Sequence, residues 1–112
     1  MGTFSIRRNE KIRTRSDFQA VYKKGKRIHS KSFIVLLSRN DKGTARFGIT
    51  VGKKVGNAVR RNRIKRLVRE FFRLNRDRFP ESTDVVVIAR KDLSLTGYRE
   101  VASELGRIFK QR

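Results

Sequence analysis

The sequence contains no cysteine and only one histidine, His29. The lack of cysteine excludes disulfides and thiolate metal sites, and it fits a reducing compartment such as the cytoplasm, where we expect the protein to act. A single histidine cannot form a histidine-based metal or catalytic cluster. No apolar run approaches the roughly 20 residues of a membrane-spanning helix, and the first residues contain no apolar signal-peptide core. We therefore expect no membrane segment and no metal site in the chain itself.

Acidic residues are also scarce, because 10 Asp and Glu stand against 30 Lys and Arg and give a formal net charge of +20. Such an excess repels itself on folding and favours a polyanionic partner. Nucleic acid is the usual one, since each neutralised phosphate releases condensed counterions. A generically basic surface is an alternative, but small domains usually carry net charges of only about 2–8. A membrane surface would need a basic amphipathic helix whose apolar stripe has no core to cover.

The apolar residues that are present, 37% of 112 residues, suffice for the core of one domain spanning residues 1–112. Their spacing is helical in some segments and alternating or continuous in others. Residues 27–30 suit either a short strand or a turn. The remaining pattern predicts, in chain order, a helix at 17–24, strands at 33–37 and 45–51, a helix from Asn57 onward, a strand at 84–89 and a helix that begins near Ser94.

Local signals set the expected element boundaries. Ser16 and Gln19 have the spacing of a capping box for the first helix, and Gly25 ends that helix. Asn57 can cap the long second helix. The polar lead-in before the first helix has three apolar anchors, Phe4, Ile6 and Ile12.

Strand pairing follows from the connections. Turn-forming residues at 40–43 join the strands at 33–37 and 45–51, which predicts an antiparallel hairpin. The strand, helix and strand between Arg46 and Ala89 predict a parallel pair within a mixed sheet. The order α-β-β-α-β-α, with room for one extra short strand, therefore indicates a single α/β domain.

Positive charge is concentrated between Lys53 and Arg73, where nine residues are Lys or Arg and one, Glu70, is acidic. An apolar helical stripe faces the core, namely Ile64, Leu67, Val68, Phe71 and Phe72. At about 100° per residue, the opposite face carries Asn62, Arg66, Arg69 and Arg73, flanked by Arg63 and Lys65. A merely solvated face would interleave Glu with Lys at i, i+4, and this face does not. The preference for Arg, whose planar fork grips phosphate and stacks on bases, indicates RNA.

The start of the same helix carries a second cluster. Arg60 and Arg61 fall beside the apolar stripe, one turn before Ile64, and should project towards the sheet edge. The loop at 52–56 and Asn57 lead to the same place, where free N–H groups and the helix dipole favour an anion. We therefore expect two RNA-binding surfaces on one helix, an outward row and a cluster at its start.

Residues 52–70, GKKVGNAVRRNRIKRLVRE, closely resemble the RNR signature of the bacterial ribonuclease P protein subunit family. Residues 17–22, followed by Gly25, resemble the first helix of that family, and residues 87–90 resemble the strand after the signature helix. The similarity extends over nearly the whole chain, in order and at the right spacing. A basic helix alone is weak evidence, whereas a signature of this length is specific.

The resemblance implies a two-layer α/β (α+β) sandwich, in which helices pack on a mixed, mostly antiparallel sheet of about four strands. It also implies a left-handed β-α-β crossover, which departs from the usual right-handed rule. In function it implies the protein subunit of ribonuclease P, an endoribonuclease that makes the mature 5′ ends of tRNA. The protein would bind a large catalytic RNA and the 5′ leader of precursor tRNA. That RNA would hold the active site and its Mg²⁺, so the protein would need no catalytic residue, metal site or protein partner.

Two sets of site residues follow from the resemblance. One set would contact the catalytic RNA: Lys53, Lys54, Asn57, Arg60, Arg61, Asn62, Arg63, Lys65, Arg66 and Arg69. The other would hold the leader in a cleft between the first helix and the sheet: Phe18, Tyr22, Lys53 and Arg90. Aromatic rings beside cations suit single-stranded RNA, although the pattern of Phe18 and Tyr22 alone favours core packing. An aromatic residue of the family cleft is replaced here by an aliphatic one near Leu36, and His29 suits polar surface or RNA contact equally well.

Two other functions compete with this one. A ribosomal or other structural RNA-binding protein without a processing role would be equally basic and cytoplasmic. A nuclease with a metal-dependent active site in the protein would need clustered carboxylates, whereas the ten acids here are scattered along the sequence. One test separates the processing role from the ribosomal one: the protein is added to a bacterial ribonuclease P RNA at low Mg²⁺, and we expect it to restore cleavage at the correct 5′ position.

Overall fold

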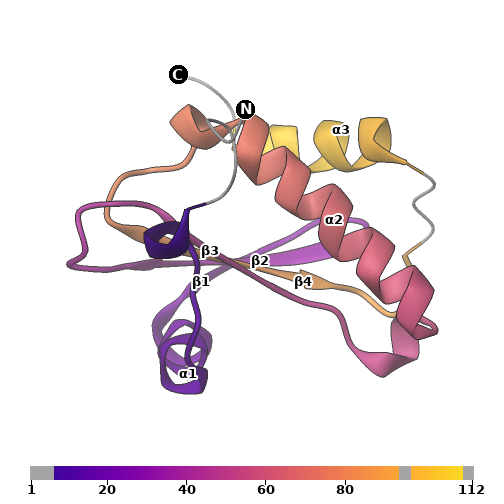
Figure 1. Cartoon of the computed structure of the whole chain (residues 1–112), viewed down its shortest axis with the longest axis horizontal. Helices are drawn as coiled ribbons and strands as arrows, with labels where there is room; N and C mark the ends of the chain where they lie inside the picture. Colours follow the sequence, from indigo (N-terminus) through magenta and orange to yellow (C-terminus); the bar gives the residue numbers. More distant parts are fainter. Residues whose placement is uncertain (1–6, 94–96, 110–112) are drawn as a thin grey trace.

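The computed structural model describes residues 7–93 and 97–109. Within these residues, three helices and four strands form the fold (Figure 1): α1 (Arg15–Lys24), β1 (Lys26–His29), β2 (Phe33–Arg39), β3 (Arg46–Thr50), α2 (Ala58–Leu74), β4 (Thr83–Ala89) and α3 (Tyr98–Ile108). Short 3₁₀ turns lie before α1, before α2 and after α2: η2 (Arg8–Glu10), η3 (Lys53–Val55) and η4 (Arg76–Arg78).

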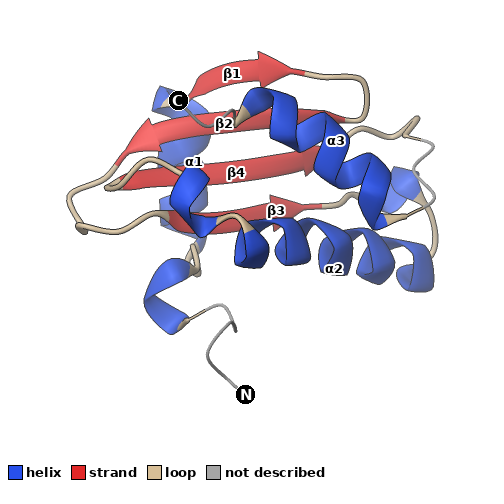
Figure 2. Cartoon of the chain, turned by 90° about the horizontal axis from the view of Figure 1, so that it is seen from above, coloured by secondary structure: helices blue, strands red, loops and turns tan. Residues whose placement is uncertain are grey.

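The strands form one sheet in the order β1-β2-β4-β3. β2 is antiparallel to both β1 and β4, whereas β3 is parallel to β4. α2 and α3 cover one face, and α1 lies against the other (Figures 1 and 2). The mixed, mostly antiparallel sheet packed by helices confirms the predicted fold class, with α1 as an added partial layer.

The predicted hairpin between residues 33–37 and 45–51 is wrong, because β4 lies between these two strands and pairs with both. A central strand is buried on both faces. β4 suits this place because its middle valines are at most 1% exposed: Val85, Val86 and Val87. β3 carries Arg46, Gly48 and Thr50 on one of its faces, and these offer little apolar surface, so an edge position costs it less burial.

The parallel strands β3 and β4 are joined through α2 by a left-handed crossover, as the family resemblance implied. Figure 1 places α2 above the sheet, and Figure 2 looks down from that side, with both strands pointing to the right and β4 above β3. When the strands are turned to point upward, the connection passes in front of the sheet and moves from right to left. This hand is opposite to that of most such units.

The first helix begins slightly earlier than predicted. α1 begins at Arg15 because Thr14, rather than Ser16, is its cap: the Thr14 hydroxyl oxygen accepts a hydrogen bond from Asp17 N at 3.1 Å. The expected end at Gly25 is confirmed.

Other boundaries agree with the prediction where the structure describes them. The segment at 27–30, which suited a strand or a turn, contributes to the edge strand β1. Ile12 is buried, and its N–H donates to the backbone of β3 at 2.9 Å, which confirms it as an anchor of the lead-in. The predicted helix start near Ser94 and the anchors Phe4 and Ile6 lie outside the described residues.

The main core lies between the sheet and the layer of α2 and α3. The predicted stripe of α2 contributes its buried residues Ile64, Val68, Phe71 and Phe72. Phe72 packs against Phe47 of β3 and against Phe79, with ring centroids 4.8 Å apart in both pairs. A smaller cluster lies under α1 and comprises Ile12, Val21, Leu36 and Val86. Ile34 and Ile88 on the same face are only partly buried, so α1 leaves part of this face uncovered.

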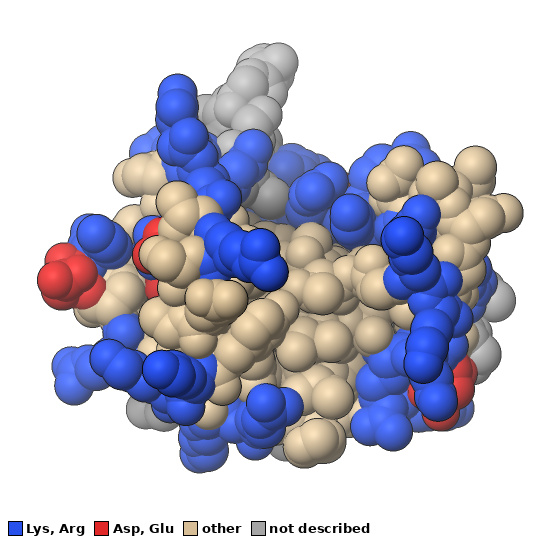
Figure 3. Space-filling view, turned by 90° about the horizontal axis from the view of Figure 1, so that it is seen from below, with Lys and Arg blue, Asp and Glu red and all other residues tan. Residues whose placement is uncertain are grey.

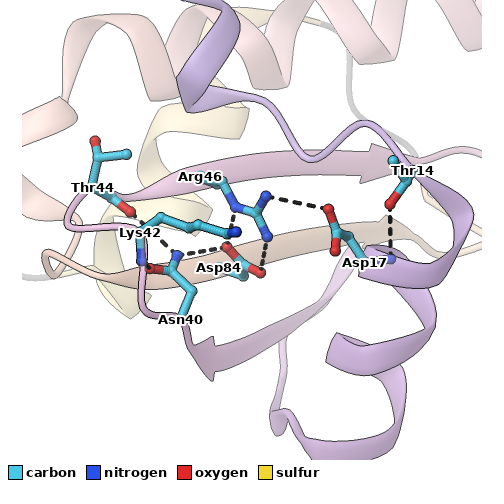
Figure 4. Close-up of polar contacts among 7 residues, drawn as sticks. All are labelled: Thr14, Asp17, Asn40, Lys42, Thr44, Arg46 and Asp84. Carbon is cyan, nitrogen blue, oxygen red and sulfur yellow. Dashed lines mark hydrogen bonds and ion pairs between the residues drawn. The ribbon is translucent and has the colours of Figure 1, made fainter.

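A buried ion pair ties the sheet to α1 (Figure 4). Asp84 accepts from Arg46 Nε at 2.8 Å, from Arg46 Nη2 at 2.7 Å and from Asn40 Nδ2 at 2.7 Å. Arg46 Nη1 also reaches Asp17 Oδ2 of α1 at 3.3 Å. The hydrogen bonds with Asp84, and then the charges of both acids, raise the pKa of Arg46, so its guanidinium stays charged. The network therefore fixes the start of α1 beside the start of β3.

Candidate nucleic-acid interface

The outer face of α2 carries cations that point away from the core. Its exposed residues include Asn62, Arg63, Arg66 and Arg69. The acid of this helix, Glu70, binds Arg73, with Arg73 Nε 2.9 Å from Glu70 Oε1, and the hydrogen bonds from Arg73 lower the pKa of Glu70. Among the described residues, Arg66 and Arg69 have no ion-pair partner. The predicted outward row is therefore a surface with excess positive charge.

The start of α2 differs from the prediction at Arg60. Asn57 caps the helix as predicted, because its side-chain oxygen accepts from Arg60 N at 2.9 Å. The Arg60 guanidinium, however, donates to the carbonyl oxygens of Val55 at 3.0 Å and Leu93 at 2.9 Å. Gly56, with φ 156°, permits this contact, because a Cβ there would lie 2.6 Å from Arg60 Cδ. Arg60 therefore joins η3 to the turn after β4, through its Nε and one of its Nη groups.

A groove lies between α1 and the edge strand β3, and we call it the aromatic groove. Its lining comes from α1, β3 and the flank of α2: Arg15, Phe18, Gln19, Tyr22, Ile49, Thr50, Val51 and Lys65. The Phe18 and Tyr22 ring centroids are 6.4 Å apart with an interplanar angle of 46°. Tyr22 is 37% exposed, and its hydroxyl lies 2.9 Å from Thr50 Oγ1. The groove thus presents two neighbouring aromatic side chains, one of them fixed to β3.

The molecular face that carries α1 is hollowed and strongly basic (Figure 3). Uncharged surface occupies the middle of this face, and Lys and Arg side chains surround it on several sides. Acidic atoms are visible only near the margins of the view. Bases can stack on such an uncharged floor while the surrounding cations meet phosphates, which is the combination that single-stranded nucleic acid requires.

Phe18 and Tyr22 fit both roles that the sequence left open, packing in the core and stacking on RNA bases. Phe18 is partly buried in the smaller core cluster, whereas Tyr22 is exposed. Leu36, near which the sequence places an aliphatic residue of the cleft, is itself fully buried. Ile34 is the partly buried aliphatic residue of β2 on the same face. Phe18 therefore supports the fold and lines the groove at the same time.

The predicted rim residues Lys53 and Arg90 do not line the aromatic groove. Lys53 and Lys54 are exposed in η3, shortly after β3, and Arg61 nearby is half-buried. Arg90 follows β4, and its Nε is 3.7 Å from Asp92 Oδ1. Because β3 and β4 are parallel and in register, these residues lie beyond the carboxyl ends of the two strands, at the same end of the sheet.

The sequence prediction missed several groove residues. Arg15, Gln19 and Thr50 were not predicted, and Lys65 was assigned to the outward row although it also lines the groove. A signal was present on α1, because residues 15, 19 and 22 follow the i, i+4, i+7 spacing of one helix face. No comparable signal shows that α2 crosses close to this face.

Gly48→Ala is expected to destabilise the protein by about 1–3 kcal/mol, because it forces an extra carbon into a packed site. A Cβ at Gly48 would lie 2.7 Å from Cε1 and Cζ of Phe18, so the ring would have to move. Chemical denaturation measures the cost. Gly52→Ala is the matched control, since a Cβ there meets nothing within 4 Å. If both variants were equally stable, Phe18 could not be held against Gly48 as described.

Residues 7–93 and 97–109 contain neither a candidate metal site nor a candidate membrane span. No group of three His, Asp or Glu side chains there is arranged to hold a metal ion. None of the helices in the same ranges is both long and apolar enough to cross a membrane.

Comparison with known proteins identifies the family. The family model described as Ribonuclease P matches residues 6–112. The ribonuclease P protein component of Syntrophus aciditrophicus is 49% identical over 106 residues, which are 95% of this chain and 89% of that protein. The solved RNase P protein of Thermotoga maritima has a TM-score of 0.82 at 40% identity, covering 90% of this chain and 96% of that one. The Staphylococcus aureus RNase P protein has a TM-score of 0.79 at 36% identity, covering 90% and 93%. The chain therefore belongs to the ribonuclease P protein family.

Proposed function

We propose that the outer face of α2 binds the catalytic RNA of ribonuclease P and that the aromatic groove holds the 5′ leader of precursor tRNA. Family membership makes the chain a protein component of ribonuclease P, a metal-dependent endoribonuclease that matures tRNA 5′ ends in partnership with an RNA subunit. The observation that carries the division of roles is the contrast between two basic surfaces. The outer face of α2 is rich in Arg, whereas the lining of the groove includes two aromatic side chains; Lys65 borders both surfaces.

The α2 face suits a folded RNA. Arg66 and Arg69 carry charge that no acid among the described residues neutralises, and guanidinium groups bind phosphate in a bidentate manner. The full proposed set is Asn62, Arg63, Lys65, Arg66 and Arg69, with Lys53, Lys54 and Arg61 near the start of the helix. Arg60 and Asn57 act within this set by shaping the helix start, because their side chains bond to the backbone.

The groove suits a single strand. Phe18 and Tyr22 offer stacking surface, and base–aromatic stacking contributes about 1–3 kcal/mol per base. Lys65 and Arg15 of the lining can bind the phosphates that accompany these bases. Lys53 and Arg90, which lie beyond the carboxyl ends of β3 and β4, would contact the RNA strand where it enters or leaves the groove.

We also propose Mg²⁺ as the metal, bound mainly by the RNA subunit. Mg²⁺ prefers oxygen ligands, keeps several waters and commonly binds phosphate groups, which RNA supplies in abundance. On this proposal the chain contributes substrate binding and charge neutralisation rather than an active site, and it needs neither another protein nor a membrane. The cytoplasm is the proposed location, because the cysteine-free sequence fits a reducing compartment.

Reconstitution tests the proposed function. Purified chain is mixed with a bacterial ribonuclease P RNA and precursor tRNA at a Mg²⁺ concentration too low for the RNA alone. The chain is expected to restore cleavage at the correct 5′ position. A ribosomal RNA-binding protein would bind RNA without this effect, so no stimulation would contradict the proposal. Cleavage by the chain without RNA subunit would place the active site in the protein.

Replacing Arg63 and Arg66 together by alanine should flatten the salt dependence of binding to the catalytic RNA. Each phosphate contact contributes roughly 0.7–0.9 to the slope of log K against log salt concentration, so two lost contacts lower that slope by about 1.4–1.8. Filter binding at several salt concentrations measures it. The control replaces Arg99 and Arg107 of α3, which removes the same charge from another surface. Equal slopes for the α2 variant and the unmodified protein would mean that the α2 row is only solvated.

A further inference from the structure

The aromatic groove does not end at Phe18. A second hollow shares Phe18 and Ile49 with it and extends to Lys11, between the start of α1 and α2. A third hollow shares Lys11 with the second and reaches Arg13 and Lys42. The first two hollows share Phe18 and Ile49, and the third adjoins the second at Lys11, where the N-terminal segment bridges β3; we call the three together the edge trough. It follows β3 from its Thr50 end to its Arg46 end.

The edge trough exists because β3 is an edge strand. β3 pairs with β4 on one side, and on the other side a single bridge joins Lys11 to Phe47. The N-terminal segment crosses β3 at this bridge and is held there by Ile12, which is 5% exposed, and by Glu10, whose Oε2 lies 2.9 Å from Arg76 Nε. A five-residue strand spans about 17 Å. The trough is therefore a fixed surface longer than the aromatic groove alone.

The charge of the far end is positive and is not neutralised by the acids around it. Glu10 is bound to Arg76, and Asp17 is bound to Arg46, which also binds Asp84 (Figure 4). Lys11 and Arg13 are exposed and have no ion-pair partner among the described residues. The two internal arginines compensate two of these three acidic charges, and the exposed cations Lys11, Arg13 and Lys42 exceed the one that remains.

We propose that the leader nucleotides farther from the cleavage site lie along the edge trough, where Lys11 and Arg13 bind their phosphates. The ligand is single-stranded RNA, and the inference rests on the proposed role of the aromatic groove. Proximity favours the leader over the catalytic RNA, because Lys11 lines the same hollow as Phe18 and Ile12, and Arg13 lies in the adjoining hollow. The middle of the trough is lined by Ile12 and Ile49 together with Arg66 and Arg69 of α2, so the leader would lie there next to the proposed catalytic-RNA surface.

A leader-length series tests this inference in the assembled ribonucleoprotein. Precursor tRNAs with leaders that grow one nucleotide at a time are bound to the complex of unmodified chain and catalytic RNA. Affinity is expected to rise in two stages, first as the leader fills the aromatic groove and then as it enters the edge trough. Lys11→Ala with Arg13→Ala should remove the second stage, a loss of roughly tenfold for two phosphate contacts, and keep the first. The control again replaces Arg99 and Arg107, which line a separate hollow against α3.

The possible outcomes separate this inference from the proposed function. If affinity did not depend on the leader at all, the proposed groove function would fail. If the first stage were present and the second stage were absent, or survived in the Lys11 and Arg13 variant, the edge trough would not be a leader site. Weaker binding of the same variant to the catalytic RNA, with an unchanged second stage, would assign these cations to that RNA and overturn the inference.

Discussion

Asp84→Ala is expected to lower the free energy of unfolding by about 3–5 kcal/mol, because it removes one partner of a buried ion pair and leaves the other without compensation. The side chains of Asp84 and Arg46 are 8% and 13% exposed. In the variant, Arg46 would keep only its longer contact with Asp17, at 3.3 Å. Asn40 would lose its hydrogen bond to the carboxylate as well. The loss thus affects β3, β4 and the turn before β3 together.

Urea denaturation measures this loss of stability, and two further variants show whether it comes from the broken ion pair. Asp41→Ala is the control, since Asp41 is exposed in the same turn and its replacement should change stability by less than about 0.5 kcal/mol. The double variant Arg46→Met with Asp84→Leu removes both charges and should recover much of the loss, because buried ion pairs often have apolar replacements of similar stability. If Asp84→Ala were as stable as the Asp41 control, the pair would not be buried and coupled as the structure has it.

The local secondary structure of this chain could be predicted from its sequence, whereas the order of strands in the sheet could not. The stripe of α2, the Asn57 cap and the strand at 84–89 depend on neighbouring residues, whose spacing is visible in the sequence. The hairpin predicted between residues 33–37 and 45–51 was wrong. It depended on the general rule that short connections favour pairing between sequential strands. Burial determines the observed strand order instead, since β4 is apolar on both faces and buries the most apolar surface in a central position.

The candidate site was predictable in kind but not in detail. Composition and helix angles indicated an RNA-binding face on α2, and the family resemblance pointed to Phe18 and Tyr22. The internal role of Arg60 was hidden, because its acceptor Leu93 is 33 residues away in the sequence. The network of Arg46 and Asp84 was hidden for the same reason, since their proximity depends on β3 and β4 being neighbours.

Phe18→Ala is expected to weaken binding of precursor tRNA to the ribonucleoprotein by roughly 5- to 150-fold, which corresponds to about 1–3 kcal/mol for one lost stacking platform. The loss should appear only for substrates with a leader, because the tRNA body does not reach the aromatic groove on this proposal. Equilibrium binding of precursor and mature tRNA to the same complex measures both. Their affinity ratio should therefore fall towards one in the variant.

Phe18 also packs in the smaller core cluster, so a second readout must separate binding from folding. Tyr22→Phe serves this purpose, because it keeps the second ring and loses only the hydroxyl that lies 2.9 Å from Thr50 Oγ1. It should retain most of the leader-dependent affinity, whereas Phe18→Leu, which keeps apolar volume without a flat ring, should recover stability more than leader binding. If Phe18→Ala weakened mature and precursor tRNA equally, Phe18 would act through the fold alone. The leader would then have to lie elsewhere on the basic face.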